Sequence, residues 1–412
     1  MMSRTRRALL LSGLFLLGVL AGILVERRLL APAAVPAGPP HGPEFRLIAE
    51  AWNAIRKNYV DQPSVRERKF TYETIKGMVE ALGDTEHSMF LTPAMRREEQ
   101  EEMDGEFAGI GVRLETRGRG IVIASLFDNA PAQRAGLAPG DRLVSVDGQR
   151  TAGMSADQVQ EAVRGPAGSE VTLDVGAKPG GKARRLVLTR ETIGQSSVGW
   201  ALVPEGDVAL IRIKVFSAGT AKGLARAIAA VSAGRARGIV LDLRDNPGGY
   251  FDEAVDVASQ FLRSGNVVLE KDRKGRVNAV AVKPEAVKTD LPLVVLVNHE
   301  SASSAEIVAG ALQDAKRALL VGEQTFGSGT VLNEVPLSDG SSLMLAVEEI
   351  LTPSGRRFWR QGIAPDVVVP QAADIEMLAP ASMACLSAAG VGQSADRQLL
   401  GALKLLRERL HD

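Results

Sequence analysis

The most strongly patterned segment near the start of the chain is an uncharged, largely apolar run from residue 8 to residue 25. Three arginines precede this run, and charged residues resume at Glu26. A basic start followed by an apolar run is typical of an export signal, and this run has about the minimum length that spans a bilayer. The pattern predicts a signal anchor over residues 1–30, with the rest of the chain outside the cytoplasm.

Helical periodicity follows a short stalk. Residues 31–43 are dominated by Pro, Ala and Gly, a composition that stays extended. Apolar residues then recur at spacings of three and four, which places them on one helical face: Phe45, Ile48, Trp52, Ile55 and Tyr59. A second helix is expected from Thr71, and Thr92 with Pro93 fits the start of a third. These patterns predict a helical segment over residues 44–104.

From Gly105 the sequence pattern changes to short apolar runs separated by glycine-rich turns. This pattern is typical of short β-strands. One helix is expected after Ser155, because Ser155 and Gln158 fit a capping box ahead of an apolar run. This segment predicts a small, strand-rich domain over residues 105–190.

From about Val198 the chain alternates between apolar runs and amphipathic helices. Three runs are long enough for buried strands: Val208–Ile213, Ile239–Leu243 and Leu293–Val297. The alternation predicts an α/β domain over residues 197–370. The tail, residues 371–412, contains one amphipathic helix with leucines at 399, 403, 406 and 410.

Composition narrows the possible functions. The 412 residues include 49 basic and 49 acidic side chains, so the net charge is zero. The sequence lacks the excess of basic residues that is typical of nucleic-acid-binding proteins. The single cysteine, Cys385, excludes an internal disulfide, and the four histidines lie far apart in sequence. We therefore expect no metal site and no cofactor.

A candidate nucleophile lies where the run 293–297 ends in small polar residues that open a helix. A serine at such a helix start has backbone N–H groups pointing toward the position of a developing oxyanion. Ser303 and the following Ser304 occupy this place. The alternative is structural, because Ser303 with Glu306 also fits a capping box, and a serine at a helix start is more often a cap than a nucleophile.

Two glycine-rich turns could add to this chemistry. Gly248 and Gly249 follow another buried strand, and their N–H groups could supply a second oxyanion donor. The segment Gly109–Ile110–Gly111–Val112 could form a nest for a carboxylate. Each turn alone is a weak signal, because most such glycine pairs are ordinary turns.

Taken in order, the motifs resemble those of the C-terminal processing, or tail-specific, serine peptidases, which are membrane-associated proteases with a PDZ domain. The resemblance covers roughly residues 44–370 and rests on these strings: AGIGV, RAGLAPGDRLVSVDG, DLRDNPGGYFDEAVDVASQFL, SASSAEIVAGALQDAKRALLVGEQTFGSGTV, PLSDGSSLML, TPSGR and GIAPDVVV. It implies a multidomain α/β fold, with a peptidase core of the crotonase and Clp-protease type and an inserted PDZ domain over residues 105–190.

The resemblance also implies roles for single residues. The family nucleophile falls on Ser303, and the oxyanion donors fall on the backbone of Gly248, Gly249 and Ser304. The nest Gly109–Val112 would bind the carboxylate of a peptide while the adjacent strand pairs with its backbone.

Two positions depart from the family pattern. The family loop TFGKG carries a lysine that acts as the general base, and a glutamine follows four residues later. Here the loop reads TFGSG, so Ser328 replaces the lysine and Leu332 replaces the glutamine. An unactivated serine hydroxyl is a poor nucleophile at neutral pH, so these changes predict weak or lost hydrolysis.

The sequence is compatible with three hypotheses for the function. In the first, the chain is an anchored protein of a bacterial inner membrane that faces the periplasm or cell exterior, binds apolar protein C-termini and hydrolyses peptide bonds weakly or not at all. In the second, Ser303 works with a substitute base, either His299 or Glu306. In the third, the chain is a scaffold that docks to an active homologue. The sequence does not give the oligomeric state.

Overall fold

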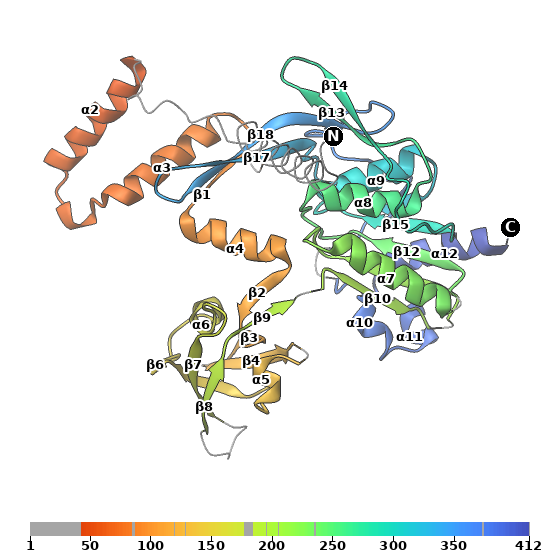
Figure 1. Cartoon of the computed structure of the whole chain (residues 1–412), viewed down its shortest axis with the longest axis horizontal. Coiled ribbons are helices and arrows are strands. Elements are labelled where there is room, and N and C mark those ends of the chain that lie inside the picture. The colour runs from red at the N-terminus through yellow and green to blue at the C-terminus, as the bar shows by residue number, and fades with distance from the viewer. Residues whose placement is uncertain are drawn as a thin grey trace, which may run out of the picture.

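The computed structural model describes residues 43–411 except for residues 85–86, 119, 128, 177–183, 195, 205, 235 and 373–374. The predicted anchor and almost all of the stalk therefore lie outside the described residues. Within the described ranges, no helix is both long and apolar enough to cross a membrane. The chain forms an N-terminal helical arm, a small β domain and a larger α/β core (Figure 1).

The N-terminal arm contains the three expected helices: α2 (Pro43–Asn58), α3 (Glu67–Glu80) and α4 (Pro93–Asp104). A short 3-10 helix, η1 (Gln62–Ser64), connects the first two. The Thr92 hydroxyl accepts a hydrogen bond from the Met95 N–H at 3.3 Å, as expected of a helix cap. The arm is not wholly helical, because β1 (Met89–Leu91) pairs with strand β18 (Ser342–Leu351) of the core.

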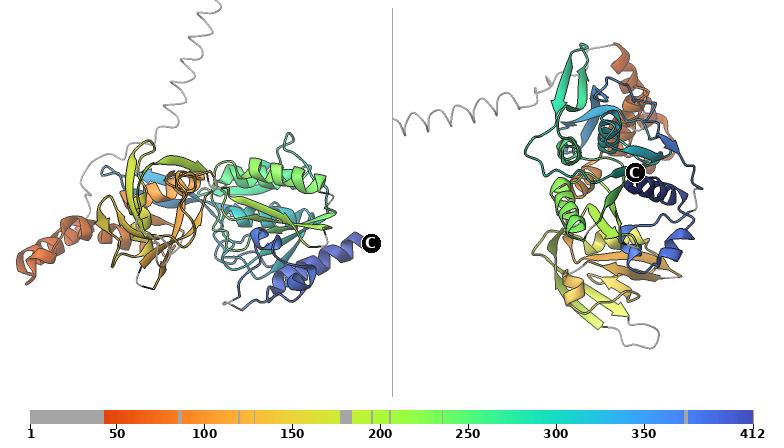
Figure 2. Two further views of the ribbon diagram at one scale, coloured as in Figure 1. Left: turned by 90° about the horizontal axis from the view of Figure 1, so that it is seen from below. Right: turned by 90° about the vertical axis from the view of Figure 1, so that its right-hand side faces the viewer.

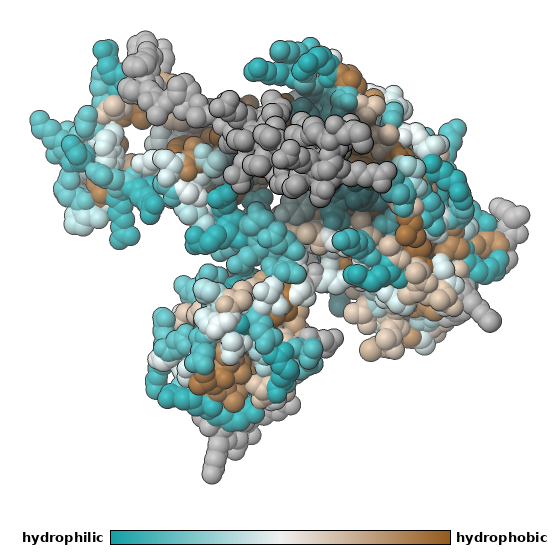
Figure 3. Space-filling model, in the orientation of Figure 1, coloured by the Kyte–Doolittle hydropathy of each residue, from teal (hydrophilic) through white to brown (hydrophobic). Residues whose placement is uncertain are grey.

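The apolar stripe on α2 is only partly covered. The Trp52 and Phe70 rings pack with their centroids 5.3 Å apart, which joins α2 to α3. Most of the other apolar side chains on α2 stay at least one-third exposed: Phe45, Leu47, Ile48 and Ile55. Brown patches among the teal residues of this arm are visible in Figure 3. The periodicity predicted the helix correctly, but not where its apolar face packs.

The small β domain is built on a sheet whose described strand pairs are all antiparallel. Its strands, in spatial order, are β3 (Val112–Arg117), β4 (Gly120–Leu126), β5 (Arg142–Val146), β7 (Glu170–Gly176) and β8 (Arg184–Thr189), and β6 (Gln149–Arg150) pairs with β5. Helices α5 (Pro131–Arg134) and α6 (Ala156–Val163) complete the domain, and α6 begins with the expected Ser155–Gln158 capping box. Strands β2 (Glu106–Gly109) and β9 (Glu191–Gly194) pair where the chain enters and leaves it.

The core is a six-stranded sheet with helices on both faces. The strand order is β10 (Val198–Leu202), β11 (Val208–Ile213), β12 (Gly238–Asp242), β15 (Leu293–Val297), β16 (Leu319–Gly322) and β19 (Val367–Val368). All neighbours are parallel except β10 and β11. Parallel strands that are covered on both faces require continuous apolar runs. This explains why the sequence predicted strands β12 and β15 correctly.

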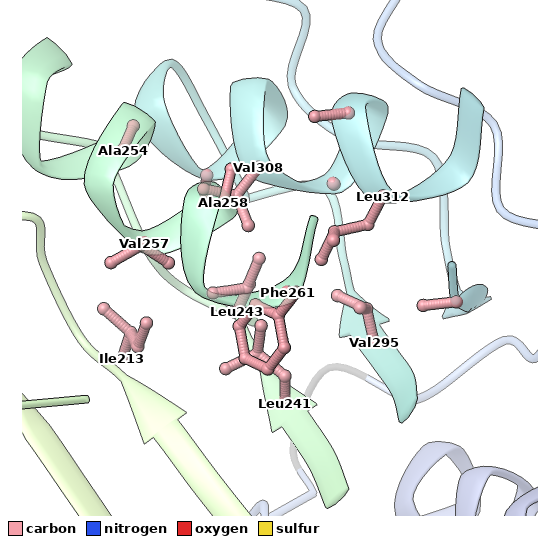
Figure 4. Packing of buried hydrophobic residues seen from close by; sticks show 14 of the residues in the cluster. Ile213, Leu241, Leu243, Ala254, Val257, Ala258, Phe261, Val295, Val308 and Leu312 are labelled. Atoms are coloured by element: carbon pink, nitrogen blue, oxygen red, sulfur yellow. The ribbon is translucent and has the colours of Figure 1, made fainter. Parts of the chain in front are cut away.

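The helices divide into two layers, as Figure 2 shows. One layer contains α7 (Thr220–Ala233), α8 (Phe251–Phe261) and α9 (Ser304–Asp314), whose apolar residues pack with Ile213, Leu241 and Val295 (Figure 4). The opposite layer contains α10 (Pro380–Met383), α11 (Ala388–Gly392) and α12 (Arg397–His411). The tail therefore covers one face of the central sheet.

A second sheet projects from the core and was predicted only in part. It contains β13 (Asn266–Asp272), β14 (Val277–Ala281), β17 (Thr330–Pro336) and β18, together with β1 from the arm. Only the first part of β13 was expected from the sequence. Strands β14 and β17 lack a continuous apolar run, so their pattern gave a weak signal. Strand β18 contains the apolar run 343–347, but the sequence analysis did not assign it as a strand.

Candidate active site and peptide groove

Ser303 occupies a strained turn between strand β15 and helix α9. Its backbone angles are φ 51° and ψ −116°, in a region that non-glycine residues rarely adopt. Such strain persists only where surrounding contacts hold it, and it concentrates at functional sites. The side chain is partly exposed at the end of the central sheet. This is the geometry of a serine presented on a sharp strand-to-helix turn.

A buried carboxylate connects this turn to the loop that contains position 328. Glu306 accepts hydrogen bonds from the N–H groups of Ser303 (3.0 Å), Gly327 (2.8 Å) and Ser328 (2.8 Å) and from the Thr325 hydroxyl (2.5 Å). Burial raises the pKa of Glu306, and these four donors oppose that rise. The Glu306 half of the predicted capping box is therefore present, but its carboxylate also fixes a second loop.

The glycine turn after β12 lies directly against Ser303. A Cβ atom built on Gly248 would lie 2.6 Å from the Ser303 Cβ, so a side chain cannot fit there. The Gly248 N–H donates to the side-chain oxygen of Asn246 at 2.9 Å. This differs from the expectation that the Gly248 amide is an oxyanion donor, because Asn246 already occupies it.

The other two expected donors are free of such a partner. Among the residues that the structure describes, no atom accepts a hydrogen bond from the amide of Gly249 or Ser304. The two turns are joined, because the Ser304 hydroxyl donates to the Gly249 carbonyl at 2.9 Å. Gly249 and Ser304 are thus the pair available to stabilise a negative oxygen at Ser303.

Asparagine side chains that the sequence analysis did not single out hold the glycine turn. The Asn246 amide donates to the Ile213 carbonyl at 2.8 Å, and the Ala302 N–H donates to the Asn246 carbonyl at 2.9 Å. The Asn298 amide donates to Asp245 at 2.7 Å. The signal available in the sequence was that these polar residues directly follow buried strands, where side chains at the end of a sheet converge.

A fully buried ion-pair network supports the start of the same turn. The Arg244 guanidinium donates to Asp242 at 2.9 Å and to Asp396 at 2.7 Å, and all three side chains are 0% exposed. Burial disfavours the charged guanidinium, but the two carboxylates outweigh this and raise the pKa of Arg244. Asp396 also accepts the Leu399 N–H at 3.0 Å at the start of α12. The C-terminal tail is therefore tied to the active-site edge of the sheet.

Neither position that departs from the family pattern offers a base. Ser328 is buried beside Glu306, and its hydroxyl is an ordinary alcohol. Leu332 lies on β17 opposite Ala346, 37% exposed, and carries no ionisable group. The loop is thus held in place by Glu306 without any group in it that could accept a proton at neutral pH.

The two candidate substitute bases are both engaged elsewhere. The His299 side chain is 71% exposed, and its Nε2 lies 3.3 Å from Glu300. Each carboxylate oxygen of Glu306 already accepts two hydrogen bonds. No hydrogen bond joins the Ser303 hydroxyl to an ionisable side chain within the described part of the chain.

The predicted carboxylate nest lies at the start of β3 in the small β domain. Gly111 has φ 76°, and a Cβ atom there would lie 2.2 Å from the Ala130 Cβ, so only glycine fits. The Ile110 carbonyl accepts the Ala132 N–H at 2.9 Å, and the side chains of Ile110 and Val112 are buried. The nest is a rigid turn, with its backbone held from behind.

A cavity of about 470 Å³ separates the small β domain from the core, between α4, β2, α6 and the end of β11. The ion pair between Arg164 and Glu101, 3.2 Å long, closes one side of it. The core side is formed by residues 214, 215 and 217, which flank Phe216. The Phe216 N–H donates to the Gly248 carbonyl at 2.7 Å, so this wall directly contacts the glycine turn.

Comparisons with known proteins agree with this arrangement. Residues 207–369 match the model of peptidase family S41, and residues 122–175 match a PDZ domain. The chain is 35% identical to the carboxyl-terminal-processing protease of Synechocystis over 86% of this chain and 81% of the relative. It is 33% identical to the carboxy-terminal-processing protease of Bartonella bacilliformis over 80% and 75%, respectively.

One solved structure supports the fold alone. It is described as an S41 protease from Bacteroides fragilis, is 17% identical, and matches 90% of this chain and 99% of its own with a TM-score of 0.50. The S41 match covers five of the six strands of the central sheet, all except β10, and includes Ser303, and the PDZ match covers most of the sheet beside the nest. On these grounds the chain belongs to the carboxyl-terminal-processing protease family, with an S41 peptidase core and a PDZ domain.

Proposed function

We propose that this family member binds apolar C-termini of proteins through its PDZ domain and hydrolyses peptide bonds weakly or not at all. The observation that carries the proposal is the loop at residues 325–329, which is anchored on Glu306 but places Ser328 where the family has its lysine base. Loss of one member of a catalytic triad typically costs about 10³ to 10⁶ in rate. The remaining oxyanion donors cannot replace a proton acceptor.

Peptide binding is proposed for the segment Gly109–Val112, which keeps the family's sequence pattern. The nest Gly109–Val112 lies at the start of β3, beside helix α6. An extended peptide can add to the free edge of such a strand through main-chain hydrogen bonds, while its terminal carboxylate binds the nest. The preference for an apolar terminal residue rests on the family resemblance, because the side chains of Ile110 and Val112 are buried in the core of the domain.

We also propose that residues 1–30 anchor the protein in a bacterial inner membrane, with the described domains facing the periplasm or cell exterior. The arginines before the apolar run support this orientation, because positive charges remain in the cytoplasm. An alkaline phosphatase fused after residue 43 should be active in cells. A fusion that is inactive there, or a chain recovered without membranes, would refute the anchor.

The binding claim is tested with the purified full chain in detergent and a labelled peptide that has an apolar C-terminus. We expect fluorescence anisotropy to show binding of the peptide with a free carboxylate and much weaker binding of its C-terminal amide. Ser303→Ala should bind equally well, because Ser303 lies outside the groove. Equal affinity for acid and amide would contradict carboxylate capture, and loss of binding in Ser303→Ala would place the binding site at the peptidase core.

A further inference from the structure

The peptide groove of the PDZ domain lies along the edge of β3 that does not pair with β4. The Gly111 carbonyl points toward β4, where it accepts the Phe127 N–H at 3.0 Å. Backbone groups of successive residues in a strand point to opposite sides. The carbonyl of Val112 therefore points to the other edge, toward helix α6, and is among the first acceptors that a peptide added beside the nest would reach.

That carbonyl already has a partner. The side-chain amide of Gln160, on helix α6, donates a hydrogen bond to the Val112 carbonyl oxygen at 3.2 Å. The contact connects the two elements that flank the groove at the end where the carboxylate nest lies. A peptide backbone N–H approaching β3 from this edge would compete for the same oxygen.

We propose that Gln160 closes the peptide groove of the free PDZ domain, so that a C-terminus binds only after this side chain has moved away from Val112. The inference rests on the proposed function, because it takes peptide binding at β3 as its starting point. Gln160 thereby sets the affinity of the groove, since each ligand must first replace an internal hydrogen bond.

The structure provides space for the displaced side chain. Gln160 also lines the cavity between the PDZ domain and the core, together with Phe107 and Arg164. The end of α6 is held there, because Arg164 pairs with Glu101 at 3.2 Å and lies over the Phe107 ring at 5.6 Å. With the helix end fixed, rotation of the Gln160 side chain into the cavity opens the groove without moving α6.

The decisive variant is Gln160→Met, which keeps the length and helix propensity of the side chain but removes its donor. We expect the labelled apolar peptide to bind this variant about two- to tenfold more tightly than the parent chain, the range that one net hydrogen bond confers. Unchanged or weaker binding would overturn the proposal, the latter because it would mean that Gln160 contacts the ligand.

A matched control is Gln133→Met. Gln133 also uses its side chain to bond a backbone group of the same domain, accepting the Asn129 N–H at 2.6 Å, but Asn129 lies outside β3 and α6. Its substitution should leave peptide affinity unchanged. An equal gain in both variants would indicate a general loosening of the domain and would contradict a specific role of Gln160.

A second readout separates this inference from the proposed function. In protein labelled with isotopic glutamine, the side-chain NH₂ signal of Gln160 is identified by its loss in Gln160→Met. We expect this signal to show slow solvent exchange in the free protein and to shift when peptide is added. If no variant binds peptide, the proposed function fails, and a rapidly exchanging NH₂ in the free protein would independently refute the closing bond.

Discussion

At the scale of single residues, Gly111 shows how one missing side chain shapes the carboxylate nest. Gly111→Ala must accommodate a methyl group 2.2 Å from the Ala130 Cβ, whereas Gly136, with φ 74°, has open space around its Cβ position. Both variants suffer the cost of a positive φ, about 1–2 kcal/mol. We expect Gly111→Ala to lose about 1–3 kcal/mol more, from overpacking.

The measurement for this pair is hydrogen exchange in strands β3 and β4 of the full chain. Protection should fall clearly further in Gly111→Ala than in Gly136→Ala, and only Gly111→Ala should lose peptide binding. Equal losses of protection would mean that the nest tolerates a side chain, contrary to the close approach of Ala130.

The sequence predicted Glu306 as part of a capping box, but not its hydrogen bonds to the loop at residues 325–328. Its carboxylate accepts four hydrogen bonds, so Glu306→Gln would point an NH₂ group at donors that cannot accept it. We expect a loss of about 2–4 kcal/mol in the free energy of unfolding, measured in urea. Glu300→Gln, six residues earlier with its side chain 62% exposed, is the control and should change stability by less than about 0.5 kcal/mol. Equal losses would remove Glu306 as the link between the two loops.

At the scale of elements, the sequence predicted strands β11, β12 and β15 of the central sheet but not strands β10, β16 and β19. Strands β12 and β15 are continuous apolar runs, and the serine pair at the start of α9 marked the turn between strand and helix. Strand β1 was missed because three residues carry no usable period and its pairing partner, β18, lies about 250 residues later. Pairings over such distances depend on tertiary packing, which local patterns do not encode.

The candidate site divides in the same way. The sequence singled out positions 303 and 249 because their motifs are local, and the family resemblance singled out position 328. The role of the Gly248 amide as an oxyanion donor stays a prediction, and the structure adds that this amide donates to the side chain of Asn246 within the same turn. The sequence did not predict a role for Asp396, because this role depends on a contact with Arg244, which lies 152 residues earlier.

The contact between Arg244 and Asp396, which precedes helix α12, can be tested by substitution. Asp396→Asn leaves the buried Arg244 with one carboxylate instead of two, and removing a partner from a buried ion pair costs about 3–5 kcal/mol. Urea unfolding at pH 7 should show a loss of this size. Asp290→Asn is the control, because Asp290 pairs with Arg263 at the surface with both side chains 69% exposed, and its loss should cost at most about 1 kcal/mol.

The pH dependence of the Asp396 effect has a definite sign. Burial disfavours its ionised form, but Arg244 outweighs this and lowers the pKa of Asp396. Its stabilisation is therefore complete above the unfolded-state pKa of about 3.9 and is lost as pH falls through the lower folded-state value. The stability difference between parent and Asp396→Asn should stay constant from pH 7 to about pH 5 and shrink below about pH 4. A difference that grows on acidification would contradict this assignment.

At the scale of the whole molecule, the first and last helices of the described residues, α2 and α12, contribute unequally to the core. Helix α12 buries Leu399, Leu403 and Leu406 against the central sheet, whereas α2 leaves most of its apolar side chains exposed. A chain ending at residue 370 loses those contacts, about 2 kcal/mol per buried leucine, and leaves Arg244 without Asp396. Since single domains are stable by only about 5–15 kcal/mol, this chain should not unfold cooperatively in urea.

The matched truncation begins at Gln62 and lacks α2. We expect it to keep the urea midpoint of the parent core and a cooperative transition by circular dichroism. If removal of α2 destabilises the core as much as removal of α12, the arm has a structural role that the exposure of its side chains does not suggest.

We propose that this chain keeps the family scaffold but lacks its general base, because Ser328 stands at the position of the family lysine. The direct measurement is cleavage of an unfolded test protein with an apolar C-terminus by the purified chain, by Ser303→Ala, and by the double variant Ser328→Lys with Leu332→Gln. We expect the parent to cut the protein at most weakly, little more than Ser303→Ala does, and the double variant to cut it readily. If the parent cuts and Ser303→Ala does not, a substitute base exists and the claim is wrong.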